Sequence, residues 1–174
     1  LVERSYSKVV FLTDENTHQH CLPLLIPELE ELGDHEVLEV PAGEDSKLPE
    51  VLVQLWYALS DLDLDRKTLM VNVGGGMITD LGGFLASTFL RGLDFINVPT
   101  SLLAMVDASV GGKNGINLDH EKNRVGLFTE PIATCILPDF LQTLPLRERR
   151  SGFAEMLKHG LISSADYWER CIAL

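Results

Sequence analysis

Short apolar runs alternate along the chain with longer amphipathic segments. Runs rich in β-branched and aromatic residues predict strands at 8–13, 36–40, 68–73, 94–98 and 133–137. Apolar residues at helical spacing predict helices over about 22–32, 48–62, 78–90 and 147–162. Parallel strands need crossover connections, which helices supply. The predicted fold class is therefore α/β: a Rossmann-like, mostly parallel sheet with helices on both faces and ligands at the carboxyl ends of its strands.

Composition and charge narrow the class of protein. Of 174 residues, 45% are hydrophobic and 23% are charged, which suits one main globular domain. The net charge of −12 argues against nucleic acid or an acidic membrane surface as a partner. No apolar run reaches the roughly 18–20 residues of a membrane span, and no signal peptide is recognisable. Three widely separated cysteines suggest neither disulfides nor a thiolate zinc site. We expect a cytoplasmic protein.

The two ends of the chain are unusual. It begins at Leu1 rather than at Met, and it stops at Leu174 without a turn or a polar tail. We therefore expect a fragment of a longer protein.

A glycine-rich turn follows the third predicted strand. The run 74–76 opens the next helix, so bare backbone N–H groups and a helix N-terminus can approach a phosphate. The run is not a GxGxxG fingerprint, and a tight strand-to-helix connection explains it equally well. Asp80 is placed either to accept from ribose hydroxyls or to cap the helix. Thr100 and Ser101 follow the fourth predicted strand and offer hydroxyls either to a cofactor or to a helix start.

A second glycine-rich segment, 107–115, combines Asp107 with Lys113. Its glycines let the backbone approach a ligand while both charged side chains point into one small volume. Lys122 and Asn123 follow a short distance on. In a chain of net negative charge, two converging lysines predict an anion site rather than random surface charge.

An acidic residue interrupts the apolar helical stretch 152–160. Glu155 must be exposed, paired or metal-bound there, and an ion pair with Lys158 is the simplest arrangement. His159 lies one helical turn from Glu155, a spacing that permits zinc chelation. Two ligands do not make a site, so any zinc site within this chain is predicted to be incomplete.

Taken together, these motifs resemble the 3-dehydroquinate synthase family. The matching segments, which span about residues 42 to 162, are 43–47, 74–80, 91–92, 98–101, 106–113, 122–123, 143–145 and 152–158. The resemblance implies an NAD-binding α/β domain over 1–145 and the start of a helical metal- and substrate-binding domain over 146–174.

The resemblance also implies an activity: a carbon–oxygen lyase of the shikimate pathway that converts 3-deoxy-D-arabino-heptulosonate 7-phosphate to 3-dehydroquinate plus phosphate. The cofactors implied are NAD and Zn²⁺ or Co²⁺. The family's reaction oxidises a ring hydroxyl transiently, eliminates phosphate, returns the hydride and closes the ring by aldol addition.

Roles for individual residues follow from the same resemblance. Those expected to hold NAD are Gly43, Glu44, Lys47, Gly74, Gly75, Gly76, Met77, Ile78, Thr79, Asp80, Thr100, Ser101, Lys113, Lys122, Phe140, Leu141, Gln142 and Thr143. Those expected to act on the phosphorylated sugar acid are Asp107, Lys113, Asn123, Lys158 and Arg91. Arg91 is expected to reach the neighbouring subunit's site in a homodimer. Glu155 is expected to be one of three zinc ligands, the others being histidines beyond Leu174.

Three positions depart from the family pattern, and three other functions stay open. Thr79 replaces a usual Gly, Ser101 replaces a common Thr, and Glu121 puts a negative charge beside Lys122.

The alternative functions are a sister sugar-phosphate cyclase, a glycerol-dehydrogenase-like enzyme, and a non-catalytic NAD-binding or dimerisation fragment. The segments 110–113 and 152–158 favour a cyclase over the dehydrogenase. With one zinc ligand, the fragment alone is expected to be inactive.

Overall fold

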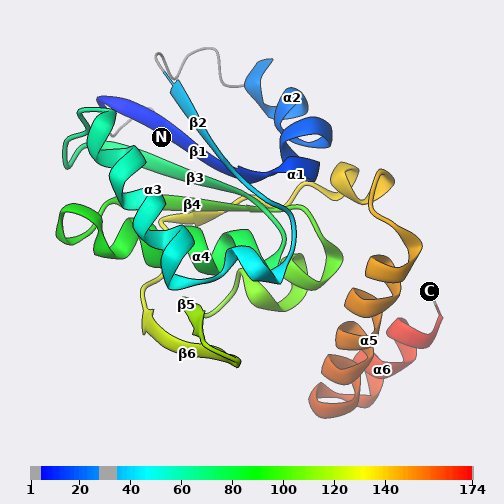
Figure 1. Ribbon diagram of the computed structural model, residues 1–174. Helices are drawn as coiled ribbons and strands as arrows, with labels where there is room; N and C mark the ends of the chain where they lie inside the picture. Colours follow the sequence, from blue (N-terminus) through cyan, green and yellow to red (C-terminus); the bar gives the residue numbers. More distant parts are fainter. Residues whose placement is uncertain (1–4, 28–34, 174) are drawn as a thin grey trace.

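The computed structural model describes residues 5–27 and 35–173. Within them a five-stranded, wholly parallel sheet forms the centre of the molecule, in the order β2–β1–β3–β4–β7 (Figure 1). Its strands are β1 (Lys8–Asp14), β2 (His35–Val40), β3 (Thr68–Gly74), β4 (Asp94–Pro99) and β7 (Ala133–Thr134). The sheet grows in one direction from β1 to β2 and in the other from β3 onward. The carboxyl ends of β1 and β3 therefore flank the switch point, where open α/β sheets bind ligands.

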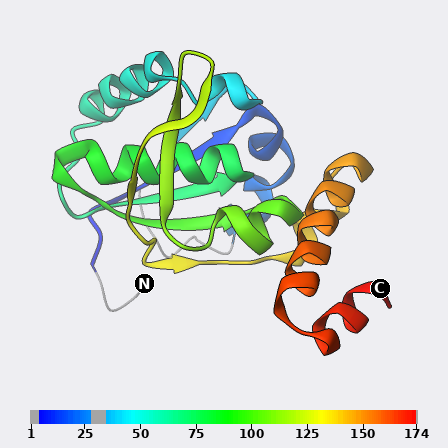
Figure 2. The same ribbon diagram turned by 90° about the horizontal axis from the view of Figure 1, so that it is seen from below.

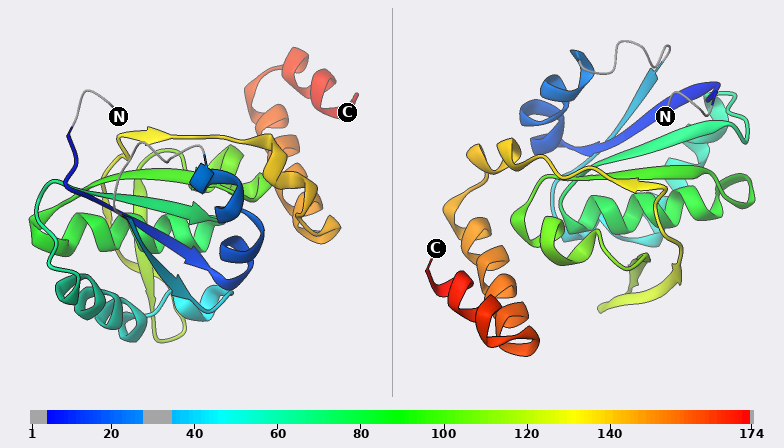
Figure 3. Two further views of the ribbon diagram at one scale, coloured as in Figure 1. Left: turned by 90° about the horizontal axis from the view of Figure 1, so that it is seen from above. Right: turned by 180° about the vertical axis from the view of Figure 1, so that it is seen from behind.

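Helices cover both faces of this sheet (Figure 3). The α-helices are α1 (Glu15–His20), α2 (Leu22–Leu25), α3 (Pro49–Asp61), α4 (Gly76–Thr88), α5 (Leu146–Ser163) and α6 (Ala165–Ile172). Shorter turns are η2 (Glu44–Ser46), η3 (Phe89–Arg91), η5 (Pro138–Gln142) and the π-helical η4 (Ala104–Ala108). The pair α5 and α6 projects from the α/β body (Figure 1). No helix in the described ranges is both long enough and apolar enough to span a bilayer.

Strand β1 shows why this sequence forms a sheet buried on both sides. Val10 and Leu12 pack with Leu59 of α3 in one apolar cluster, while Val9 and Phe11 belong to the cluster on the opposite face. Successive residues of a strand point to opposite faces, so a strand covered on both faces reads as a continuous apolar run.

Helix α4 is the central layer of a three-layer stack. A two-stranded antiparallel hairpin, β5 (Lys113–Leu118) with β6 (Glu121–Phe128), crosses its outer face (Figure 2). A Cβ on Gly82 would overlap the side-chain amide of Asn72 in β3, and a Cβ on Gly83 would overlap that of Asn114 in β5. Consecutive helical residues are about 100° apart around the axis. The glycine pair therefore lets the sheet and the hairpin approach α4 from two sides.

Most predicted elements are confirmed, with three corrections. The helix predicted over 22–32 is wrong as one element: an Asp14 cap starts α1, and α2 already ends at Leu25. Residues 28–32 of that prediction lie outside the described ranges. The strand predicted over 133–137 shortens to β7, whose pairing with β4 covers only Ala133 and Thr134. The hairpin was not predicted at all.

Candidate functional site

The glycine turn at the switch point forms an open cradle. Gly75 is the N-cap of α4, and among the described residues no side chain caps that helix end. The Thr100 N–H donates to the carbonyl oxygen of Gly74 at 3.0 Å, which ties the turn to the end of β4. A Cβ on Gly76 would lie 3.1 Å from the Cβ of Ala108, so any side chain here would crowd the space beside the helix end. Free N–H groups with this access favour a phosphate.

The two hydroxyl residues after β4 differ in their surroundings. Thr100 is buried, with 5% of its surface exposed, and Ser101 is half-buried. Ser101 Oγ accepts a hydrogen bond from the Ala104 N–H at 3.3 Å, and it lies 3.4 Å from where a Cβ on Gly75 would be. Ser101 therefore caps the turn toward η4 and also borders the cradle, so the two interpretations of this residue are compatible.

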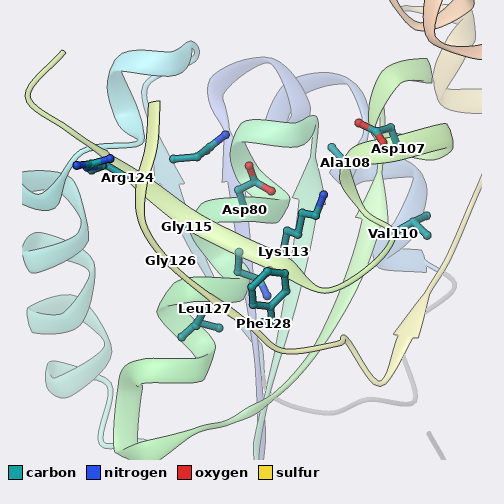
Figure 4. A pocket seen from close by; sticks show the side chains of 12 residues that line it. Asp80, Asp107, Ala108, Val110, Lys113, Gly115, Arg124, Gly126, Leu127 and Phe128 are labelled. Carbon is teal, nitrogen blue, oxygen red and sulfur yellow. The ribbon is translucent and has the colours of Figure 1, made fainter. Parts of the chain in front are cut away.

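A pocket of about 570 Å³ lies beside the cradle, between α4, η4 and the hairpin. It is lined by Asp80, Asp107, Lys113, Asn123 and Phe128, among others (Figure 4). Figure 4 shows the amino end of Lys113 on the same side of the pocket as the Asp80 and Asp107 carboxylates. The structure thus brings together three of the five residues expected to act on substrate and two of those expected to hold NAD, Lys113 being in both groups.

Asp80 has an unusual electrostatic environment. Burial raises the pKa of its carboxyl, and a hydrogen bond and ion pair with Lys47 oppose that rise. The charges of Glu44 and Asp107 push the pKa further upward. Desolvation and like charges both disfavour a carboxylate, whereas a partner cation favours it. Lys47 is therefore the group that keeps the charged form of Asp80 accessible.

A candidate metal cluster forms where α5 meets η4. Ligand atoms of Asp107, Glu155 and His159 all lie within 4.8 Å of one another, and His159 Nε2 is 3.3 Å from Glu155 Oε1. Close packing brings the helices together, since a Cβ on Gly152 would lie 2.5 Å from the Leu103 backbone nitrogen. Carboxylate oxygen and imidazole nitrogen are zinc donors, so the donor set fits a divalent metal.

The predicted pair of Glu155 and Lys158 is also present. The Lys158 ammonium hydrogen-bonds the Glu155 carboxylate and lowers its pKa. Sequence reasoning noted His159 from its spacing but missed Asp107 as a neighbour of Glu155. No local signal joins positions so far apart in the chain.

Several residues expected to hold NAD have side chains that face elsewhere. Ile78, Thr79 and Phe140 are at most 2% exposed and belong to the interior, so only their backbone groups can meet a ligand. Leu141 packs against the same apolar cluster as Phe140. Met77 is partly buried against the core.

Other predicted residues lie on the surface. Gln142 Nε2 donates to Asp139 Oδ1, and Thr143 Oγ1 donates to the Phe140 carbonyl oxygen. Gly43 has a φ of 114°, which is the left-handed region that favours glycine, and it is the N-cap of η2.

The predicted convergence of two lysines is wrong. Lys113 lines the pocket, but Lys122 is 73% exposed and its Nζ lies 3.9 Å from Glu44 Oε1. Its neighbours Asn123 and Arg124 line the pocket, whereas Lys122 does not. Arg91 lies beyond the far end of α4, about 20 Å along the helix from the cradle.

Comparison with known proteins identifies the family of this chain. The model of the 3-dehydroquinate synthase N-terminal family matches residues 37–151. A 3-dehydroquinate synthase from Parabacteroides distasonis is 48% identical over 161 residues, covering 92% of this chain and 45% of its own length. One from Chlamydia trachomatis is 43% identical, covering 90% of the chain and 42% of its own length. The chain thus spans somewhat less than half the length of these curated relatives.

Solved structures of similar fold add two cyclases and a dehydrogenase. A 2-deoxy-scyllo-inosose synthase complexed with carbaglucose-6-phosphate, NAD⁺ and Co²⁺ superposes with a TM-score of 0.88 at 26% identity, covering 94% of this chain and 46% of its own. A 2-epi-5-epi-valiolone synthase from Streptomyces hygroscopicus with NAD⁺ and Zn²⁺ bound superposes with a TM-score of 0.86 at 29% identity. The match covers 95% of this chain and 47% of that protein. Glycerol dehydrogenase from Schizosaccharomyces pombe shares the fold alone, with a TM-score of 0.67 and 21% identity. That match covers 88% of this chain and 37% of the dehydrogenase. With its family-model match running from β2 into α5, the chain belongs to the 3-dehydroquinate synthase family.

Proposed function

We propose that this chain is the NAD-binding part of a 3-dehydroquinate synthase, a carbon–oxygen lyase that releases phosphate from a heptulosonate phosphate. The observation that carries the proposal is the uncapped N-terminus of α4, in the described residues, opening beside the pocket of Asp80 and Lys113. The two cyclase structures named with NAD⁺ and a divalent metal share this fold at more than 25% identity. The much higher identity to 3-dehydroquinate synthases favours that activity over the sister cyclases.

The residues present define what each would contribute. NAD accepts and returns a hydride when bound, and its pyrophosphate would lie against the N–H groups of Gly76 and Met77. Asp80, kept ionisable by Lys47, would accept hydrogen bonds from a ribose. Lys113 would hold an anionic group of the substrate, where a charge-assisted hydrogen bond is stronger than a neutral one.

Glu155 would hold the metal, which polarises a hydroxyl when bound. Asp107 and His159 border the same space. The Lys158 ammonium donates a hydrogen bond to Glu155 Oε1, and a metal ion would compete with that ammonium for the same oxygen. Lys158 would then be released toward an anionic group of the substrate.

Calorimetry with NAD tests the proposal on the 174-residue chain. We expect saturable binding by the chain and at least tenfold weaker binding by Gly76→Val, because the added side chain fills the cradle against Ala108. Tyr57→Ala, at a residue of α3 that is 70% exposed, is the matched control and keeps the affinity of the unsubstituted 174-residue chain. Equal affinities for the unsubstituted chain and Gly76→Val would contradict the proposal.

The enzyme assignment itself is tested on the parent protein with its C-terminal half. We expect metal-dependent phosphate release from 3-deoxy-D-arabino-heptulosonate 7-phosphate, loss of that activity in Glu155→Ala, and no turnover by the 174-residue chain. We further propose a homodimer in which Arg91 serves the neighbouring site. Sedimentation of the parent protein as a monomer would contradict that part.

A further inference from the structure

Lys47 is a buried lysine that joins three separate elements. It follows η2, and only 3% of its side chain is exposed. Its Nζ donates to Asp80 Oδ2 on α4 and, at 2.5 Å, to Asn123 Oδ1 on the hairpin. Lysines are almost never fully buried unless they are paired, because an unpaired charge loses its hydration without compensation. The ammonium is therefore committed to these two partners.

Further hydrogen bonds link the hairpin to η2 and to the residue that follows it. The Asn117 N–H donates to the Lys47 carbonyl oxygen at 2.8 Å, and Asn117 Nδ2 donates to Glu44 Oε1 at 2.9 Å. Asn117 Oδ1 in turn accepts from the Asn123 N–H at 2.9 Å. Asn123 has a φ of 54°, a left-handed conformation that asparagine adopts more readily than most residues.

The two ends of the hairpin are attached in different ways. Near its base, Asn114 packs against Gly83 of α4 and donates to the carbonyl oxygens of Gly112 and Thr129. Near its turn, around residues 117–123, the described hydrogen bonds to other elements run to η2 and to Lys47. Removing the Lys47 ammonium takes away the bond to Asn123 Oδ1 and leaves the backbone bond from the Asn117 N–H in place. We therefore expect the turn end to loosen around Asn123 while the base stays in place.

We propose that Lys47 is a positioning residue that fastens the turn end of the β5–β6 hairpin to α4, so that the two sides of the pocket form one site. Asp80 belongs to the helix side of that pocket, and Asn123 belongs to the hairpin side. Lys47 then acts on a ligand through these two residues rather than by direct contact. The identity of that ligand rests on the proposed function, but the fastening of the hairpin does not.

The test is hydrogen exchange in the 174-residue chain carrying Lys47→Met. We expect amides in 117–123 to exchange at least tenfold faster, while amides of β1 and β3 keep their protection. A general loss of stability would change both groups, whereas a local fastening changes the first alone. Lys67→Met, which removes an exposed lysine outside the pocket, is the control and leaves both groups unchanged.

Two further variants keep the test decisive. Lys47→Met leaves Asp80 buried without its cation, so Lys47→Met/Asp80→Asn restores folding if the single variant is unstable. Asn123→Ala removes the hairpin's acceptor while keeping the Lys47–Asp80 pair. We expect both to show the same local increase in exchange over 117–123.

Unchanged exchange over 117–123 in the folded variants would overturn the proposal, even if NAD binding fell, because Lys47 would then act by direct contact. Faster exchange there supports the proposal even if the unsubstituted 174-residue chain binds no NAD. In that case only the proposed function is contradicted.

Discussion

Gly83→Ala is expected to destabilise the protein although alanine is the better helix former. The new Cβ would lie 2.5 Å from Asn114 Cγ, whereas carbon atoms pack best at about 3.5–4.0 Å, so the amide must move by roughly 1 Å. Asn114 cannot move freely, because its Nδ2 donates to Gly112 O at 3.0 Å and to Thr129 O at 2.7 Å.

The magnitude follows from these contacts. Overpacking costs about 1–3 kcal/mol, and each hydrogen bond lost costs about 1 kcal/mol. The better helix propensity of alanine returns about 1 kcal/mol. The net loss in the free energy of unfolding is therefore about 2–4 kcal/mol, which lowers Tm by roughly 5–15 °C in a chain of this size.

A double-mutant cycle followed by thermal denaturation isolates the cause. In the Asn114→Ala background the nearest remaining side-chain atom is the Cβ at 3.3 Å, which needs a shift of only a few tenths of an ångström. The Gly83→Ala step should then change the free energy of unfolding by less than about 1 kcal/mol. Equal losses in both backgrounds would refute the close approach of α4 and the hairpin.

Three further predictions concern other parts of the molecule. Burial raises the pKa of the Cys21 thiol to about 11, so at pH 8 iodoacetamide should modify exposed Cys135 and spare Cys21 until the chain is unfolded; equal labelling would contradict this. The hydrogen bond from Ser7 lowers the pKa of the Asp65 carboxyl below 3.8. The ionised carboxylate therefore stabilises the fold above pH 3.8, and that stabilisation is lost as the pH falls through the lowered pKa. A titration midpoint of Asp65 at or above 3.8, measured by NMR, would refute this prediction. Leu59→Ala, at a fully buried site, should cost about 2–5 kcal/mol in urea denaturation, and a loss below 1 kcal/mol would count against the packing of α3.

The sequence predicted the sheet well because its strands are buried on both faces. Runs such as 68–73 are continuous and apolar, which sets them apart from helices and loops. The hairpin had no such signal: every residue of β6 except Leu127 is exposed, and Gly115 and Gly126 interrupt the pattern. In β5 the four inner residues are buried, but two of them are asparagines and one is a glycine, so apolar periodicity could not find this ribbon.

The candidate site was predicted in part. The family assignment is confirmed, and the structure gathers Asp80, Asp107, Lys113 and Asn123 around one pocket. The roles of those residues stay predictions. The pairing of Lys47 with Asp80 and Asn123 joins positions 33 and 76 residues apart, and only the fold brings them together. Spacing along the chain carries no information on such contacts.

The hairpin joins none of the parallel strands in the described part of the chain, since its two strands pair only with each other. Insertions, deletions or new side chains in this ribbon would thus leave the hydrogen-bond register of the main sheet untouched. Substitutions in the ribbon can therefore reshape its side of the pocket, where Lys113 and Asn123 lie, without changing how the parallel strands beneath it pair.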